Sequence, residues 1–177
     1  LRTYDPAPPA GVRLPVGSET CTSVDAAIAG ADLVSVSVPP AEVVGVVAEI
    51  DRDRPLLIEK PGAANSRDAL RILDHHRAVV VAYTALYDAC LIAARDDVRS
   101  TTRGPVRVRV ARMHHASPAV GVVEDLLVHD LALCHSLQIA IDDAVARVVE
   151  TAPYEVRARL EHPTGTADFD ASLRFPG

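Results

Sequence analysis

The stretch Leu56-Leu57-Ile58-Glu59-Lys60-Pro61-Gly62 decides how this chain of 177 residues is interpreted. Its apolar start is typical of a buried parallel strand, and its polar end is where open sheets bind ligands. Lys60 is the one lysine among 18 basic residues, so an amine stands where this chain otherwise uses guanidinium. An ammonium can exchange its proton in a suitable environment, whereas guanidinium stays charged. The position therefore indicates a chemical role for Lys60, with an ordinary surface lysine as the plain alternative.

Strands and helices alternate on both sides of this stretch. Apolar runs predict parallel strands at residues 33–38, 56–59 and 79–83, and helices are expected at residues 25–29, 42–50 and 66–77. Ser23 and Ser66 are the expected caps of the first and last of these helices. Strand, helix, strand, helix, strand with short links predicts an α/β fold with a Rossmann-like parallel sheet.

The rhythm changes after about residue 100. Residues 106–110 alternate valine with arginine, the period of a strand with one buried face. A helix is expected at residues 122–141, and antiparallel strands at 146–151, 154–161 and 167–175. We therefore expect a Rossmann-like domain over residues 1–88, followed at 89–177 by an incomplete α+β domain with a mostly antiparallel open sheet and one covering helix.

Composition excludes several classes of protein. A formal charge of -6 argues against a nucleic-acid or anionic-membrane surface, because phosphate binding needs clustered positive charge. Three widely spaced cysteines fit free thiols in a reducing compartment, and no apolar run approaches the roughly 20 residues of a membrane span. We expect a cytoplasmic protein whose partners are small molecules or proteins. The chain begins at Leu1, so a removed upstream segment remains an option.

A second group of polar residues lies on the helix expected at residues 122–141. Asp125 and His129 are four residues apart and share a helix face, so the carboxylate can orient the imidazole as in a general acid/base pair. The same two residues could ligate a metal ion with a third ligand from the remaining histidines, for which the candidates are His114, His115 and His135. No spacing matches a known zinc motif, so no metal is expected. An exposed ion pair is the third interpretation.

Taken together, these residues resemble a known family. Asp5 after a strand, the strand at 33–38 running into Pro39-Pro40, the triplet Glu59-Lys60-Pro61, and Asp125-x-x-x-His129-Asp130 are similar in order and spacing to the Gfo/Idh/MocA oxidoreductases. The string at residues 120–130 looks most like the shorter branch that contains UDP-N-acetylglucosamine 3-dehydrogenases. The resemblance covers nearly all of the chain, and the triplet combined with the later helix is its most specific part.

The resemblance implies a nicotinamide cofactor and a role for each matching residue. Asp5 would contact the adenosine ribose. Val38, Pro39 and Pro40 would form the loop beside the cofactor. Glu59 would lie near the nicotinamide ribose. Lys60, Asp125 and His129 would surround the carbinol carbon of a secondary alcohol. Apart from the resemblance, Tyr83 and Tyr87 are candidate substrate contacts because they fall near the carboxyl end of another strand, with core packing as the alternative, and Asp130 is a third candidate. NAD is slightly favoured, because Asp5 would repel a ribose phosphate, while Arg2 and Arg13 leave NADP open.

The implied reaction is hydride transfer between an alcohol or ketone and the nicotinamide, in a sugar, cyclitol or related intermediate. His129 could accept the alcohol proton while Lys60 stabilises the alkoxide, or Lys60 could itself be the base. The family's G-x-G-x-x-G turn does not occur in the chain, and it would precede Leu1. A relative without redox activity, serving as a binding or oligomer-forming module, is therefore the second hypothesis. The resemblance also implies a homo-oligomer formed through the C-terminal sheet.

Overall fold

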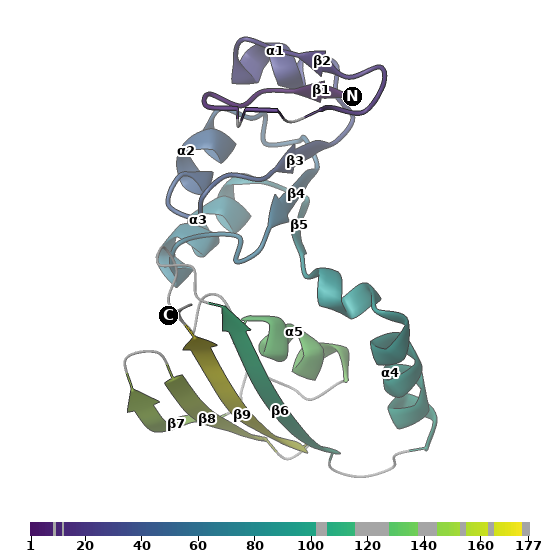
Figure 1. Ribbon diagram of the computed structural model, residues 1–177, viewed down its shortest axis with the longest axis vertical. Helices are drawn as coiled ribbons and strands as arrows, with labels where there is room; N and C mark the ends of the chain where they lie inside the picture. Colours follow the sequence, from purple (N-terminus) through teal and green to yellow (C-terminus); the bar gives the residue numbers. More distant parts are fainter. Residues whose placement is uncertain are drawn as a thin grey trace. The chain divides into compact units, whose positions relative to one another are not determined.

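The computed structural model describes residues 1–8, 10–11, 13–101, 106–115, 128–137, 145–152, 155–162 and 165–174. The chain divides into two compact units, Leu1–Ala82 and Tyr83–Gly177 (Figure 1). No helix among these residues has both the length and the apolar character that crossing a membrane requires.

The first unit is built around a parallel sheet of three strands with the order β3-β4-β5. Two further strands, β1 and β2, form a separate parallel pair. The elements in chain order are β1 (Arg2–Thr3), β2 (Glu19–Thr20), α1 (Val24–Ile28), β3 (Val34–Val36), α2 (Val43–Ala48), β4 (Leu56–Glu59), α3 (Ser66–His75) and β5 (Val79–Ala82). The expected parallel sheet is confirmed, and β2 is an element that the sequence did not predict.

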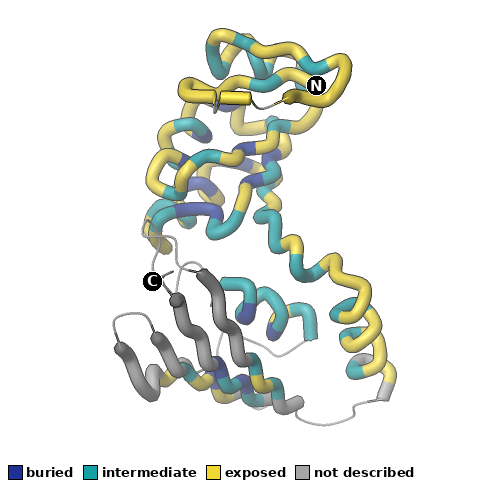
Figure 2. Tube along the Cα trace, viewed as in Figure 1, coloured by how far each residue is buried: buried dark blue, intermediate teal, exposed yellow. Residues whose placement is uncertain are grey.

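One face of this sheet carries the core of the first unit. Helices α2 and α3 lie side by side on that face (Figure 1), and Figure 2 shows the buried residues gathered between them and the strands. Val36, Leu56 and Ile58 from the strands pack with the buried residues of the two helices, Val43, Val47 and Ile72. Val80 alternates to the opposite face and is 55% exposed. The apolar alternation along the strands thus decides which face the helices cover.

Helix caps explain where the helices of this unit begin. The Ser23 hydroxyl accepts from the Ala26 backbone N–H at 3.2 Å, which confirms the predicted cap of α1. Helix α3 is capped by Asn65 and not, as expected, by Ser66. The Asn65 side chain accepts from the Asp68 backbone N–H at 3.0 Å and donates to the Asp68 carboxylate at 2.8 Å. This reciprocal pair satisfies the first turn better than a serine hydroxyl could.

His75 and His76 end α3 in different surroundings. Their place at the end of a helix predicts that both are exposed; His75 is exposed, but His76 is only 4% exposed, which corrects that expectation. Its Nε2 lies 3.1 Å from the Val47 carbonyl oxygen, so the ring donates to the last turn of α2. This bond draws His76 out of the helix into an extended conformation, and α3 ends at His75.

The second unit contains a four-stranded sheet with the order β6-β9-β8-β7. Its described elements are η1 (Thr84–Tyr87), α4 (Ala89–Thr101), β6 (Val106–His115), α5 (Val128–Ser136), β7 (Val145–Ala152), β8 (Glu155–His162) and β9 (Gly165–Arg174). Strand β8 pairs antiparallel with β7 and with β9, while β6 pairs parallel with β9. The expected mostly antiparallel sheet is confirmed, with one parallel pair at its edge.

Helix α4 is absent from the sequence-based assignment, although the chain carries a signal for it. The Asp88 carboxylate accepts from the backbone N–H groups of Cys90 and Leu91, at 2.8 and 3.4 Å. Leu91, Ile92, Arg95 and Val98 are the partly buried positions that follow, at helical spacing. An N-cap aspartate before this pattern predicts a helix, so α4 is an additional helix that the sequence could have indicated; it contacts η1.

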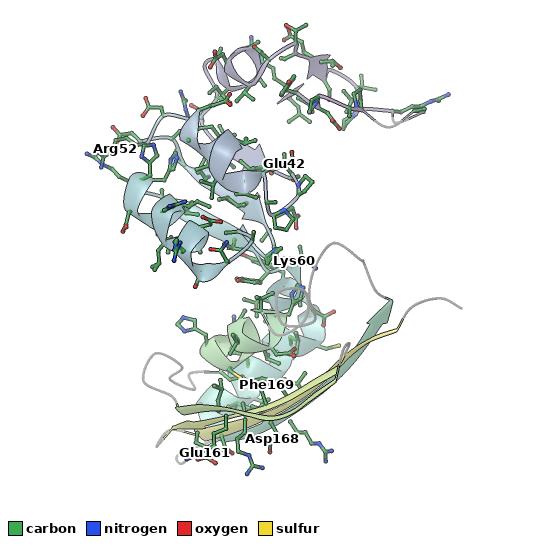
Figure 3. The ribbon with its side chains drawn as sticks, turned by 90° about the vertical axis from the view of Figure 1, so that its left-hand side faces the viewer. Glu42, Arg52, Lys60, Glu161, Asp168 and Phe169 are labelled. Carbon is green, nitrogen blue, oxygen red and sulfur yellow. The ribbon has the colours of Figure 1, made fainter. Side chains whose placement is uncertain are left out.

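The two faces of the second sheet differ in chemistry. Helix α5 lies over one face, where Leu160, Ala167 and Phe169 are buried (Figures 1 and 3). Asp168 and Glu161 project from the other face (Figure 3), as strand alternation requires. Asp168 accepts from Arg159 at 2.6 Å, and Arg147 lies 3.9 Å from Glu161. The outer face therefore carries cross-strand ion pairs, with Arg109 exposed as predicted.

Candidate functional site

Lys60 lies in a tight turn at the carboxyl end of β4. A cis peptide bond joins Lys60 to Pro61, and the Gly62 N–H donates to the Glu59 carbonyl at 2.9 Å. The four residues form the turn type that holds a cis proline at its third position. The Lys60 side chain is partly buried, and Figure 3 shows it at the opposite end of the first unit from Arg52.

Gly62 explains why this turn can pack closely against the next strand. Its φ is +85°, a conformation that residues with a Cβ rarely adopt. A Cβ added there would lie 3.1 Å from Val81 Cγ2 on β5. Gly62 and the following Ala63 are both buried, so the chain passes directly from the turn into the core. The turn, and with it the Lys60 backbone, is therefore held between β4 and β5.

The loop after β3 leaves the sheet at the same edge. Strands β3 and β4 are parallel with Val36 opposite Ile58, so both carboxyl ends reach one side of the sheet. Val38 packs against the core, and the Pro39 carbonyl accepts from the Glu42 N–H at 2.8 Å to begin the turn into α2. This is the edge at which open α/β sheets bind ligands.

Arg2 lies in the first strand, β1, and Asp5 lies just after it. The Asp5 carboxylate accepts from the Ala7 backbone N–H at 2.8 Å, which orients it within its own turn. The Arg2 guanidinium donates to the Ala29 carbonyl at 2.7 Å and pairs with Glu19 at 3.1 Å. Arg2 thus ties β1 to β2 and α1 through its Nε and Nη1 atoms.

His129 lies on α5 in the second unit, where Tyr83 packs against it. The ring centroids are 6.1 Å apart with an interplanar angle of 77°, an edge-on arrangement. Both side chains are partly buried, and burial raises the pKa of the Tyr83 phenol. Tyr87, the second predicted tyrosine, is 75% exposed. The sequence named Tyr83 and His129 separately but did not predict their contact, because nothing in a linear pattern pairs a strand end with a distant helix.

Asp130 differs from its neighbour His129, because it is only 1% exposed. It lies on the buried side of α5 with Cys134, one helical turn away. Burial, and then the charge of Asp130, raise the pKa of the Cys134 thiol to about 11. Cys134 therefore stays protonated near neutral pH and serves as a packing residue, since the thiolate is the reactive form.

Asp125 lies outside the described residues, so its pairing with His129 stays a prediction. Of the histidines named as metal ligands, His135 is exposed on α5, and His114 and His115 end β6. Within the described parts of the chain, no three His, Cys, Asp or Glu side chains gather as a metal site would require. Each unit thus contributes its own set: Lys60, Glu59 and the proline loop in the first, Tyr83 and His129 in the second.

Solved structures with this fold are oxidoreductases of the type that the sequence resembles. The dehydrogenase WlbA (WbpB) of Thermus thermophilus, in complex with NAD and α-ketoglutarate, matches 98% of this chain at 17% identity with a TM-score of 0.76. The UDP-N-acetylglucosamine 3-dehydrogenase of Acidithiobacillus ferrooxidans matches 90% of this chain at 20% identity with a TM-score of 0.70. The myo-inositol dehydrogenase of Lactobacillus casei, in complex with NAD(H) and myo-inositol, matches 88% of this chain at 16% identity with a TM-score of 0.70.

These matches establish the fold over nearly the whole chain. The chain spans 64%, 56% and 53% of the three matched proteins, respectively. No protein-family model matches the chain, and no curated protein matches it in sequence. The α/β class with a Rossmann-like sheet is therefore confirmed from structure.

We predict that Gly62→Ala destabilises the first unit by about 1 to 3 kcal/mol, because alanine is strained at this φ and its Cβ would press on Val81. Urea unfolding followed by circular dichroism measures the change. Gly45→Ala is the matched control: Gly45 lies within α2 with no atom near a built Cβ, so alanine there should be neutral or slightly stabilising. Equal effects of the two substitutions would contradict the prediction.

Proposed function

We propose that the protein is an NAD(P)-dependent oxidoreductase that transfers hydride between a nicotinamide cofactor and a secondary alcohol or ketone. The substrate class is a sugar, a cyclitol or a related biosynthetic intermediate. One observation carries the proposal: a chain with the fold of dehydrogenases crystallised with NAD has its one lysine in the turn that ends the central strand.

The cofactor proposal rests on the first unit. Asp5 would accept the adenosine ribose hydroxyls, for which its turn already orients the carboxylate. The loop after β3 would contact the cofactor through Val38, Pro39 and Pro40. Glu59, at the end of β4, would lie near the nicotinamide ribose. The carboxylates of Asp5 and Glu59 can accept hydrogen bonds from ribose hydroxyls, and the apolar loop residues can pack against the cofactor, while the pyrophosphate would need the glycine turn that residues 1–177 do not contain. NAD is slightly favoured over NADP, because the Asp5 carboxylate would repel a ribose phosphate and two nitrogens of the Arg2 guanidinium already bind Glu19 and Ala29.

The reaction needs one proton and one hydride to leave the alcohol as the carbonyl forms. The nicotinamide, when bound, supplies the hydride acceptor at C4. His129 would take the hydroxyl proton, since an imidazole ordinarily titrates near pH 6.5 and can accept a proton at neutrality. Asp125 would stabilise the imidazolium, and Lys60 would donate a hydrogen bond to the developing alkoxide. The alternative assignment makes Lys60 the proton acceptor.

Substrate contacts in this proposal come from the residues that can reach solvent. Tyr83 and Tyr87 would face the substrate, as neutral phenols able to donate and accept hydrogen bonds. Asp130 was proposed for the same task, and its burial favours an indirect contribution from inside the second unit. The small-molecule substrates of the matched dehydrogenases support this choice of partner.

The outer face of the second sheet is the proposed contact with a second copy of the chain. Arg147 and Arg159 lie opposite each other on β7 and β8 and pair with Glu161 and Asp168, so the same face offers both signs of charge. A two-fold contact brings a surface against itself, and a surface with both signs can be complementary to its own copy.

The first expected result concerns cofactor binding by the intact polypeptide. NADH should bind saturably in calorimetry and more tightly than NADPH. Asp5→Ser should reduce this preference by roughly 10-fold or more, because it removes a charged acceptor for ribose hydroxyls. Asp51→Ser is the matched control, since Asp51 makes the same turn contact with the Asp53 N–H at 2.9 Å before β4. Absence of saturable binding would reject the cofactor and favour the non-redox module.

A second expected result separates the two assignments of the proton acceptor. With NAD and a panel of alcohols including myo-inositol and UDP-N-acetylglucosamine, His129→Asn should lower kcat roughly 100-fold or more. Lys60→Arg should keep more activity than Lys60→Met, because charge is retained. His135→Asn, on the exposed side of the same helix, is the control. Equal loss in the Arg and Met variants, with a mild effect of His129→Asn, would make Lys60 the base.

A third expected result concerns assembly. Sedimentation should reveal an oligomer that dissociates as salt increases, since exposed ion pairs are screened. Arg147→Glu with Arg159→Glu should shift the protein toward monomer. Arg52→Glu with Arg67→Glu makes the same charge change on exposed positions of the first unit and should leave the oligomer intact. An unchanged sedimentation coefficient in the first double variant would exclude this face as the interface.

A further inference from the structure

The contact between Tyr83 and His129 joins two segments that are far apart in the sequence. The rings meet edge-on, with centroids 6.1 Å apart and an angle of 77° between their planes. Aromatic pairs prefer this arrangement because the positive edge of one ring meets the negative face of the other. Both residues are partly buried, so the contact is partly shielded from water.

Tyr83 is well supported on its own side of this contact. It directly follows Ala82, the last residue of β5, which pairs with Glu59 on β4. Its carbonyl accepts from the Leu86 N–H at 2.9 Å, which begins η1. The η1 segment contacts both α4 and α5. A ring mounted between a strand end and a helical turn has little freedom, which suits it to orient a neighbour.

The charge state of Tyr83 also suits this position. Burial raises the pKa of its phenol, so the ring stays neutral over the range in which an imidazole gains and loses its proton. The Tyr83 ring therefore carries no charge of its own while the imidazole changes charge. An acidic or basic side chain in the same place would change the energy of the imidazolium itself.

We propose that Tyr83 is a positioning residue for His129, whose ring holds the imidazole in the orientation from which it accepts the substrate proton. This inference rests on the proposed oxidoreductase function and adds to it the residue that orients the proton acceptor. The essential part of Tyr83 is its ring and not its hydroxyl. Tyr83→Phe should therefore preserve the effect and Tyr83→Leu should remove it.

The test uses the intact polypeptide and two readouts. The first is the NMR signal of the His129 imidazole, assigned by its loss in His129→Asn. Tyr83→Leu should move this signal because the ring current is lost and the imidazole reorients, whereas Tyr83→Phe should leave it near its original position. Tyr4→Leu, which truncates an exposed tyrosine with no proposed role, is the matched control. Circular dichroism checks that each variant is folded.

The second readout is steady-state turnover with NAD and the alcohol panel. Tyr83→Leu should lower kcat roughly 10- to 100-fold with the KM for NAD unchanged, because a misaimed base slows proton transfer without affecting cofactor binding. Tyr83→Phe should restore kcat to within a few-fold, on the order of what a lost hydroxyl contact costs. Loss of kcat and NAD affinity together would indicate general damage and overturn the proposal.

The two readouts keep the two proposals separate. An unchanged His129 signal in Tyr83→Leu overturns the positioning role whatever the activity. A changed signal with full kcat shows that the orientation does not matter for catalysis, and this also overturns the proposal. Absence of turnover in the wild-type protein rejects the proposed function, and the NMR comparison then decides by itself whether Tyr83 orients His129.

Discussion

The close approach of Gly62 to Val81 is the constraint on which the first unit depends. It brings the turn after β4 against β5, and a Cβ at this φ would be strained and would press on the Val81 side chain. The approach lets Ala63 enter the core directly after the turn, and it leaves Lys60 at the carboxyl edge of the sheet. A packing requirement in the core thus determines where the amine lies.

In the second unit, the candidate residues are placed by their positions around helix α5. Helix α5 presents two adjacent residues to different surroundings: Asp130 is buried beside Cys134, and His129 is partly buried against Tyr83. One residue step around a helix, about 100°, separates a packing position from a chemical one. In the proposed hydride transfer, the imidazole of His129 would accept a proton and the amine of Lys60 would stabilise an oxyanion.

Local signals in the sequence were sufficient to predict the bounds of an element wherever those bounds depend on neighbouring residues alone. Strand β4 has the predicted bounds, since an apolar run ends at a charged residue followed by a turn. Helix α4 carried an adequate signal in Asp88 that went unused. The cap of α3 was misplaced by one residue, because Asn65 and Ser66 are both good caps and only the bond from Asn65 to Asp68 selects between them.

The alternation of apolar runs and helix formers was enough to specify an α/β fold, the parallel sheet and the edge that carries Lys60, because these follow from periodicity and burial along one segment. Tertiary structure was required for three features: the burial of His76, the parallel pairing of β6 with β9, and the contact of Tyr83 with His129. Each of these joins residues that are distant in the chain, and such pairings are selected by the packing of whole elements, which no local pattern encodes.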